Sequence, residues 1–428
     1  MRNSKKILLL CFLLCLAALV LPAQTREGRR PGDDLTIKVA VMGPGDQLYF
    51  WWGHISLIIE DARTGLSRVY DYGIFSFDSE NFFVNFAFGR LIYCCGASPM
   101  QPVFNAYIRT NRDITVYTLD LPPEKREEVR AFAEENILPE NRYYSYHHFD
   151  DNCSTRIRDI IDLATDGQFR EQFGNAPGRY TLRQHVRRHT WFSPFADWAL
   201  NFLMGQGIDT PITIWKEMFL PAEVGKRISG FQYTDSSGVS RHLVSGVETV
   251  YAALGRPGVL DVPRRQWPRE LAFSLVIAAL LGFLFFIQSK KPALGQVALG
   301  VSHSILGLFF GIAGLLLFFM SFFTNHDYTW HNANLLFANP LLLAAVPLGI
   351  RYAGAKTYDE RFIAEALLRL LWFLVVLGIF LSMLIKLFPP FWQQNLTDQM
   401  LMLPIALVLA LEPFGLKKIL ERVFRKRT

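Results

Sequence analysis

Charge is scarce in this chain: only 19% of its 428 residues are Asp, Glu, Lys or Arg, whereas 51% are hydrophobic and 14% are aromatic. This composition excludes an intrinsically disordered chain and a nucleic-acid-binding tail. Five cysteines are too few for a disulfide-stapled scaffold. The formal net charge of +6 comes largely from the last dozen residues and from short stretches between apolar runs, which favours membrane topology over a polyanionic partner. We therefore predict a membrane protein that binds no nucleic acid.

The N-terminus has the three regions of a secretory signal. A basic start (Arg2, Lys5, Lys6) precedes an apolar run over residues 7–21 and a short polar segment over residues 22–24. The small-x-small pattern before the cleavage site is imperfect. We predict export, with residues 1–25 serving as a cleaved signal or as an uncleaved anchor.

The character of the chain changes near Glu270. Residues 36–262 have the alternation and turn residues of a mixed soluble domain, with short strands first and amphipathic helices later. Five apolar stretches of roughly membrane-spanning length then follow at residues 271–287, 297–323, 335–350, 370–387 and 400–416. We predict a five-helix transmembrane domain over residues 270–416 and a basic cytoplasmic tail over residues 417–428.

The basic residues between these stretches fix the orientation. They are Lys290, Lys291, Arg351, Lys356, Arg361 and Arg369, and all fall on the same side as the basic tail. The opposite loops, residues 324–334 and 387–398, contain neither Lys nor Arg. Because Lys and Arg accumulate on the cytoplasmic side, the soluble domain is predicted to lie in the periplasm, on a bacterial inner membrane.

Cys153 is the strongest candidate for a chemically reactive residue. Asp151 or Asn152 is a suitable N-cap, so a helix is predicted to begin almost at Cys153. Unpaired N–H groups and the positive end of the helix dipole favour a thiolate there. The alternatives are a buried structural cysteine or a disulfide with Cys94 or Cys95.

His54 is the candidate base for this thiol. It begins a predicted strand directly after Gly53, and a turn over residues 61–65 leads to a second strand over residues 66–72. Pairing in this hairpin brings His54 opposite Asp71 or Tyr72. We predict Cys153, His54 and Asp71 as nucleophile, base and orienting carboxylate, although a lone histidine here would more often be structural.

Other histidines are weaker candidates. His147 and His148 precede the nucleophile and are placed to act as donor or alternative base. His185 and His189 have a zinc-compatible spacing, but the arginines around them disfavour a metal, and we predict a solvated or lipid-facing basic surface. We predict no metal and no cofactor.

A polar, aromatic loop over residues 325–334 is predicted to lie on the periplasmic side close to the bilayer. Interfacial anchoring explains its aromatic residues. Its polar side chains His326, Asn332 and Asn334 are alternatively placed to bind substrate.

The order of the two reactive residues, His before Cys, resembles the circularly permuted papain-like (NlpC-type) group, which includes lecithin retinol acyltransferase-like thiol enzymes. A set of motifs is similar to the Lnb-type lipoprotein N-acyltransferase family. The motifs that match its periplasmic domain are residues 52–54, 70–77, 81–83, 151–159, 180–183 and 215–221, and residues 332–340 match its membrane unit. The expected fold is α+β in the periplasmic domain, followed by an α-helical bundle.

The resemblance implies that a fatty acyl chain moves from a phospholipid, through a thioester on Cys153, to the N-terminal amine of a diacylglyceryl-cysteine lipoprotein. The residues expected to contact substrate are Asn152, Trp52, Tyr72, His148, His326, Asn332 and Asn334. An aromatic set offers apolar surface for acyl chains, although core packing or membrane docking would explain it equally: Phe82, Phe83, Phe86, Phe88, Trp51 and Trp52.

Two other functions use the same sequence features. A periplasmic cysteine peptidase or amidase acting on peptidoglycan would employ the same catalytic pair, but five membrane spans exceed what that substrate needs. A non-enzymatic membrane partner protein would retain the fold without depending on Cys153.

Overall fold

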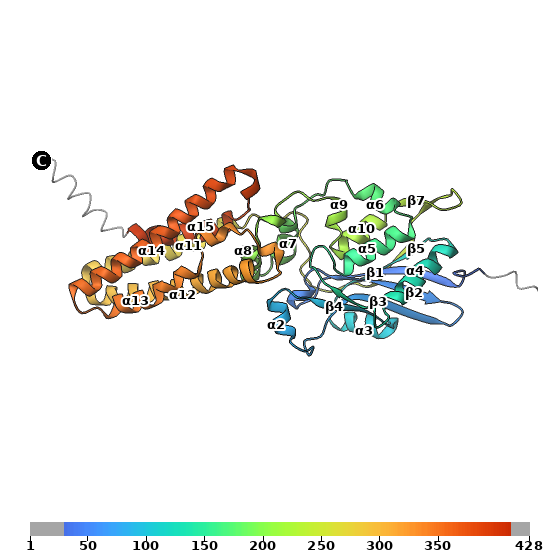
Figure 1. Cartoon of the computed structure of the whole chain (residues 1–428), viewed down its shortest axis with the longest axis horizontal. Helices are drawn as coiled ribbons and strands as arrows, with labels where there is room; N and C mark the ends of the chain where they lie inside the picture. The colour runs from blue at the N-terminus through green and yellow to red at the C-terminus, as the bar shows by residue number, and fades with distance from the viewer. Residues whose placement is uncertain (1–29, 412–428) are drawn as a thin grey trace, which may run out of the picture.

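The computed structural model describes residues 30–411 and shows two bodies joined end to end (Figure 1). One body contains a β-sheet covered by helices, and the other is a bundle of long helices that begins at Trp267. The predicted order, a mixed α/β domain followed by a helical domain, is confirmed. The predicted signal or anchor over residues 1–25 and the basic tail over residues 417–428 lie outside the described residues.

A seven-stranded antiparallel sheet forms the centre of the first body, in the order β6-β4-β3-β2-β1-β5-β9. Its strands are β1 Leu35–Met42, β2 His54–Asp61, β3 Leu66–Ile74, β4 Ile92–Pro99, β5 Ile114–Leu119, β6 Tyr143–Ser145 and β9 Val244–Tyr251. In β1, Ile37 and Val39 are buried on one face of the sheet, and Ala40 and Met42 are buried on the other. The central strands are therefore covered on both sides.

Helices supply this cover. α3 (Met100–Arg109) packs on one face through Phe104. The other face carries α4 Pro123–Asn136, α5 Cys153–Ala164, α6 Gln168–Phe173, α9 Ile214–Glu217 and α10 Pro221–Ile228. The apolar positions of α5, Ile157, Ile160, Ile161 and Ala164, are all buried against the sheet, as their spacing predicts. This packing fixes where the first turn of α5 lies.

Short elements complete the first body: α2 Phe82–Ala87, the hairpin β7 Gln232–Thr234 and β8 Ser240–His242, and the 3₁₀ turns η1 Leu48–Phe50 and η2 Gln206–Ile208. Two further helices, α7 (Leu182–Thr190) and α8 (Pro194–Leu203), lie at the junction of the two bodies (Figure 1). Trp198 of α8 stacks on Phe309 with ring centroids 5.6 Å apart. Trp198 and Phe202 of α8 therefore pack in the same apolar cluster as the long helices of the second body.

Within residues 30–411, four segments are long and apolar enough to cross a membrane: Trp267–Lys290, Pro292–Phe323, Ala333–Gly354 and Tyr358–Leu387. They contain α11 Trp267–Lys290, α12 Pro292–Phe323, η4 Ala333–Leu336, η5 Pro340–Ala344, α13 Ala345–Gly354, α14 Tyr358–Leu384 and η6 Ile385–Leu387. The turn η7 Pro389–Phe391 then leads to α15 (Leu396–Leu411), a shorter apolar helix of 16 residues. Part of the predicted fifth span, residues 412–416, lies outside the described residues, so the count of five stays a prediction.

Small residues let α12 and α13 approach closely. A Cβ atom at Gly300 would come within 2.5 Å of the carbonyl oxygen of Gly349, and a Cβ at Gly349 would meet the carbonyl oxygen of Gly300 at 2.4 Å. Backbone contact between small residues is a common way for membrane helices to associate, since lipid provides no hydrophobic drive.

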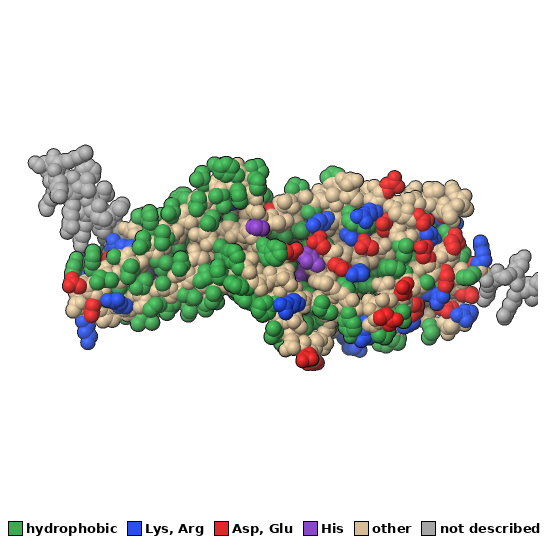
Figure 2. All heavy atoms as spheres, in the orientation of Figure 1, with side chains coloured by type: hydrophobic (Ala, Val, Ile, Leu, Met, Phe, Trp, Pro, Cys, Tyr) green, Lys and Arg blue, Asp and Glu red, His purple; other side chains and the backbone are tan. Residues whose placement is uncertain are grey.

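The surface of the helical body fits a lipid environment. Figure 2 shows apolar side chains over most of its length, with Lys and Arg gathered at the end farthest from the sheet domain. The two loops that lack Lys and Arg lie at the junction, where Asn325 and Gln394 contact the first body. The chain is thus a membrane protein whose basic loops and sheet domain lie at opposite ends of the bundle.

Candidate active site

Cys153 is the first residue of α5, and Asn152 is its N-cap. The Asn152 Oδ1 atom accepts hydrogen bonds from the backbone N–H groups of Ser154 (2.8 Å) and Thr155 (3.0 Å), and the Thr155 hydroxyl accepts one from the Asn152 N–H at 2.8 Å. This capping box starts the helix at Cys153 but leaves the N–H of Cys153 outside the cap. The sulfur therefore lies at the positive end of the helix dipole.

The ring of His54 meets the carboxylate of Asp71, with His54 Nε2 2.9 Å from Asp71 Oδ1. The hydroxyl of Ser56 donates a hydrogen bond to the same carboxylate oxygen. The predicted hairpin is present, but its register differs from the prediction by one to two residues. The paired residues run from Asp61 and Leu66 to Leu57 and Tyr70. Continued along the strands, this register sets Ser56 opposite Asp71 and His54 opposite Gly73. His54 and Asp71 are thus diagonal neighbours on one face of the sheet.

Electrostatics couple the thiol to this ring. Burial, the largest influence, raises the pKa of Cys153, but the charge and hydrogen bonding of His54 and the backbone N–H of Ile55 outweigh it, so the pKa is lowered. Burial likewise opposes protonation of His54, but Tyr107, Cys153 and Asp71 together raise its pKa well above the ordinary value. The two shifts act together, so each group favours the charged form of the other.

The Asp71 carboxylate is held in its charged form. Burial would raise the pKa of Asp71, but the hydrogen bond and charge of His54 and the hydroxyl of Ser56 lower it. With His54 Nε2 bound to Asp71, the other ring nitrogen, Nδ1, is left for the sulfur. The structure thus couples the three residues predicted to be catalytic: His54 binds the carboxylate of Asp71 and interacts with the thiol of Cys153.

The ring of Tyr107 packs on His54, and the guanidinium of Arg112 packs on Tyr107 in turn. Tyr107 of α3 stacks on the His54 ring, with centroids 6.3 Å apart and planes at 12°. The buried guanidinium of Arg112 lies 4.5 Å from the centroid of Tyr107 and 4.4 Å from that of Phe50. Sequence reasoning missed both residues, because no local pattern connects them with His54.

Two tyrosines on and next to the edge strand β6 lie within the electrostatic influence of Cys153. Burial, followed by the charge of Cys153, raises the pKa values of Tyr144 and Tyr146. The buried hydroxyl of Tyr144 has no hydrogen-bond partner among residues 30–411. Gly73 makes room for them: its φ is +84°, and a Cβ there would lie 3.2 Å from the Tyr146 ring and 3.8 Å from the Tyr144 hydroxyl. The run Tyr143–Tyr146 was the available signal in the sequence.

The loop between α12 and η4 docks beside the segment that precedes the nucleophile. It contains the turn η3 (Asp327–Thr329). His147 Nε2 lies 3.0 Å from Asp327 Oδ1, and the hydroxyl of Tyr328 lies 3.3 Å from His148 Nδ1. Burial lowers the pKa of His148 to about 4, so this ring is neutral and a weak base. Among the described residues, the membrane unit therefore reaches the active-site region through this loop.

Most of the other predicted substrate-contacting residues are held by contacts within the protein. The carboxamides of Asn152, Asn332 and Asn334 donate hydrogen bonds to backbone carbonyl oxygens, and all three residues are buried. His326 binds the carbonyl oxygen of Phe86 through Nε2, at 2.9 Å, and the hydroxyl of Tyr328 through Nδ1. These contacts give the four side chains a positioning role.

Two aromatic candidates remain. Trp52 is partly buried against the cluster that contains Phe149 and Phe219. Tyr72 is buried on the α5 face of the sheet and lines, with Asp151 and Arg156, a cavity of about 290 Å³. Trp52 thus packs in the core beside the strand that carries His54, and Tyr72 lies on the side of the sheet opposite His54.

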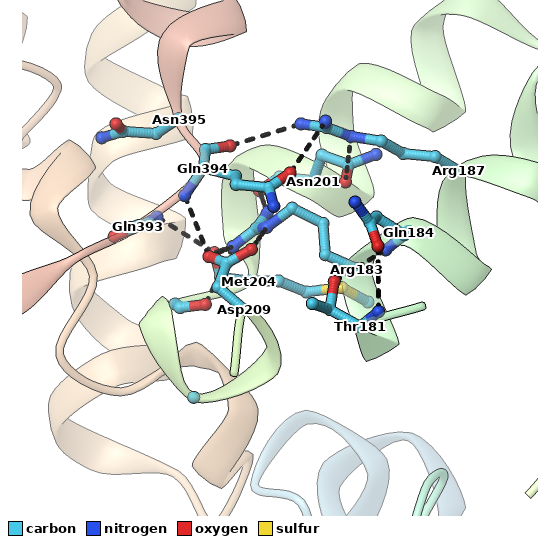
Figure 3. Close-up of polar contacts among 12 residues, drawn as sticks. Thr181, Arg183, Gln184, Arg187, Asn201, Met204, Asp209, Gln393, Gln394 and Asn395 are labelled. Carbon is cyan, nitrogen blue, oxygen red and sulfur yellow. Dashed lines mark hydrogen bonds and ion pairs between the residues drawn. The ribbon is translucent and has the colours of Figure 1, made fainter. Parts of the chain in front are cut away.

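The prediction for α7 was wrong: its basic residues do not form a solvated or lipid-facing surface. Arg183 and His185 are fully buried, and Arg183 binds both carboxylate oxygens of Asp209 at 2.7 and 3.0 Å. Figure 3 shows Arg183 with Asp209, and Arg187 reaching Gln394 of the membrane unit. Buried charges persist when they are paired and hydrogen-bonded, and here the partners come from distant segments.

Cys94, Cys95 and Cys153 are all free thiols. Burial raises the pKa values of Cys94 and Cys95, so they remain protonated where Cys153 ionises. Within residues 30–411, no group of three or more His, Cys, Asp or Glu side chains could hold a metal ion.

Family models match both bodies of the chain. The Lnb N-terminal periplasmic domain matches residues 27–188, which include His54, Asp71 and Cys153, and the Lnb transmembrane domain matches residues 266–415. Comparison with curated proteins and with solved structures returned no match. Since the two models together cover well over half of the chain, it belongs to the Lnb family and carries that family's periplasmic and transmembrane domains.

Proposed function

We propose that this protein is a thiol-dependent acyltransferase that moves a fatty acyl chain from a phospholipid to the N-terminal amine of a diacylated lipoprotein. The observation that carries the proposal is the position of Cys153 at the start of α5, coupled to the His54–Asp71 pair and next to a loop of the membrane unit. A lipid ester and a lipid-anchored amine both reside at the membrane surface. A nucleophile held there can meet both.

We further propose that residues 36–262 form a permuted papain-like thiol domain with a helical extension and that residues 270–416 form a five-helix membrane domain. His54 on a strand, followed by Cys153 at the start of a helix packed on the same antiparallel sheet, supports this arrangement. The proposed location is the bacterial inner membrane, with the thiol domain in the periplasm.

In the first step the Cys153 thiolate attacks the ester carbonyl carbon of the phospholipid, forming a carbon–sulfur bond. The carbonyl oxygen becomes an oxyanion, which the N–H of Cys153 is placed to bind. The carbon–oxygen bond to the glycerol then breaks, and imidazolium His54 gives its proton to the departing alkoxide. The products are a Cys153 thioester, a lysophospholipid and a neutral His54.

In the second step the lipoprotein amine attacks the thioester carbonyl. Neutral His54 takes the proton that the amine loses as the carbon–nitrogen bond forms. The carbon–sulfur bond breaks, which restores the thiolate and the imidazolium. An ordinary α-amino group has a pKa of about 7.7–8.0, so a useful fraction of the substrate is already unprotonated near neutral pH.

The unpartnered hydroxyl of Tyr144 is proposed as a second donor to the oxyanion. Tyr144→Phe is expected to lower kcat for Cys153 acylation by about 10²–10³-fold, the usual cost of removing one such donor. The pKa of Cys153, measured by alkylation, should stay unchanged. Tyr143→Phe is the matched control, because Tyr143 on the same strand is 56% exposed. Equal rates in the two variants would exclude this role.

Reconstituted protein tests the activity itself. Vesicles of phospholipid with an isotope-labelled acyl chain, mixed with a synthetic diacylated lipopeptide, are expected to yield the triacylated peptide, detected by mass spectrometry. A lipopeptide with an acetylated N-terminus should stay unchanged while Cys153 still becomes acylated. Protein that cleaves muropeptides and leaves the lipopeptide intact would instead be a peptidoglycan peptidase or amidase.

A further inference from the structure

An aromatic patch on the sheet domain presents several exposed phenylalanine rings. It consists of Phe75, Phe77, Phe82, Phe83, Val84 and Phe86, on and before the short helix α2, whose six residues include no charged side chain. The ring of Phe77 contacts the rings of Phe75, Phe82 and Phe83, with centroid distances of 5.1 to 6.2 Å. Phe83 is 70% exposed, Val84 55% and Phe86 44%. This is more contiguous apolar surface than a water-facing helix of a soluble domain normally carries.

Contacts with the membrane unit fix the position of the patch relative to the membrane-spanning helices. Phe88, one residue beyond the C-terminus of α2, packs on Phe319 with ring centroids 5.4 Å apart. The N–H of Asn325 donates to the carbonyl oxygen of Phe88 at 2.9 Å. The backbone of Gly89 lies close to Asn325: a Cβ atom at Gly89 would come within 2.8 Å of the carbonyl carbon of Asn325. Phe319 lies in the last turns of the apolar helix α12, so α2 is level with the periplasmic end of a membrane span.

The lipid-facing surface of α12 continues toward the patch. Phe322 and Phe323, at the end of α12, are largely exposed. In Figure 1, α2 lies at the junction of the two bodies, beside the end of α12 nearest the sheet domain. The exposed phenylalanines of α2 are therefore continuous with a surface that faces lipid.

A series of ring contacts leads from the patch toward the thiol. Phe75 stacks on Tyr93 at 5.0 Å, and Tyr93 packs on Tyr146 at 4.5 Å. Tyr146 in turn meets the ring of His148, in the segment that precedes the nucleophile, with centroids 5.5 Å apart. Aromatic side chains thus lead from the exposed face of α2 toward the segment that carries the reactive sulfur.

We propose that α2 and its aromatic patch are immersed in the outer leaflet of the membrane, and that the acyl chains of the donor phospholipid reach Cys153 along these rings. The occupant is lipid, because the six side chains of the patch are themselves uncharged, Phe77, Phe83 and Phe86 are exposed, and the patch adjoins the lipid-facing surface of α12. Asp78 and Glu80, in the turn between Phe77 and Phe82, are exposed beside it. The immersion stands on geometry alone, whereas the acyl route rests on the proposed function. Aromatic side chains are well suited to the interfacial depth that the Phe88–Phe319 contact defines.

Photo-crosslinking tests the immersion without requiring activity. p-Benzoylphenylalanine in place of Phe83, in the full-length protein in membranes, is expected to crosslink to phospholipid at least tenfold more than the same group in place of Leu66. Leu66 is a matched control, because it is 59% exposed and lies at the other end of the β2–β3 hairpin from His54. Equal lipid adducts at the two positions, or none at Phe83, would overturn the immersion.

Kinetics test the acyl route. Cys153 acylation is measured with two donors, a bilayer phospholipid and a water-soluble short-chain ester, and the rate with the phospholipid is divided by the rate with the ester. Phe83→Asp is expected to lower this ratio at least tenfold. Leu66→Asp is expected to leave it unchanged. An unchanged ratio in Phe83→Asp would overturn the route. If the unaltered protein forms no Cys153 adduct with either donor, the proposed chemistry fails, and the crosslinking result still decides the immersion.

Discussion

Cys153→Ala is expected to abolish acyl transfer. Protein incubated with phospholipid and no acceptor should carry one acyl adduct, on the peptide that contains Cys153, and the variant should carry none. The loss should reach at least about 10³-fold, because the reaction loses its covalent intermediate. Cys94 and Cys95 offer no substitute, since burial raises their pKa values and keeps them protonated. Intact-protein and peptide mass spectrometry measure the adduct.

Cys94→Ala is the control for this prediction, because it removes a thiol that burial keeps protonated. It should form the adduct at the normal rate, and both variants should accumulate in the membrane. Triacylated lipoprotein formed at an unchanged rate by Cys153→Ala would contradict the thiol mechanism and favour a non-enzymatic partner role. An adduct on another residue would place the nucleophile elsewhere.

The helix start and the hairpin were predictable because their signals are local. The Asn152 side chain and the backbone groups that it caps are two or three residues apart, and the β2–β3 turn is closed by Asp61 and Gly65. The register within the hairpin was not predictable to one residue. It depends on which residues close the turn: Asp61 pairs with Leu66, and a turn one residue longer or shorter would shift every pair in the hairpin.

Tyr144 and Tyr146 could not be placed from the sequence. Their position depends on β6, only three residues long, which pairs with β4 from about fifty positions away. They also need the positive φ of Gly73 on a third strand. Contacts of this kind depend on sheet order, which no local pattern encodes.

The burial of α7 could not be predicted from the sequence for a related reason. Its arginines have the composition of a surface helix, but Asp209 and Gln394, 26 and 207 positions away from their partners, complete the hydrogen bonding. The packing of Trp198 against the membrane helices likewise depends on how two separate bodies meet. Sequence periodicity describes one element at a time and cannot show which element covers it.

His54→Gln is expected to lower the rate of Cys153 acylation by about 10²–10⁴-fold, the range that general acid–base groups contribute. The same variant should raise the pKa of Cys153. Burial favours the neutral thiol, and the charge of His54 is the largest influence that opposes it. The rate of iodoacetamide alkylation at the Cys153 peptide, measured against pH, should shift its midpoint upward. An unchanged midpoint would show that the imidazole does not ionise the thiol.

Asp71→Asn separates proton transfer from mere positioning. Asp71 contributes to the raised pKa of His54, so in the unaltered protein the imidazolium persists above its ordinary range, and acylation is lost only as pH rises through that raised value. Without the carboxylate the pKa of His54 falls, and the alkaline limb of the profile of kcat/KM against pH should move to lower pH. Asp61→Asn, at the exposed turn of the same hairpin, should leave the profile unchanged.

The direction of that shift distinguishes two roles for the carboxylate. If Asp71 only held the ring in place, Asp71→Asn would lower kcat/KM equally at every pH, because the protonation of His54 would not change. If Asp71 stabilises the imidazolium, the loss is small at acidic pH and grows with alkalinity, since His54 can no longer supply the proton that the departing lysophospholipid requires. A uniform loss would therefore remove the ion pair from the mechanism, and a movement of the alkaline limb to higher pH would contradict the electrostatics of the site.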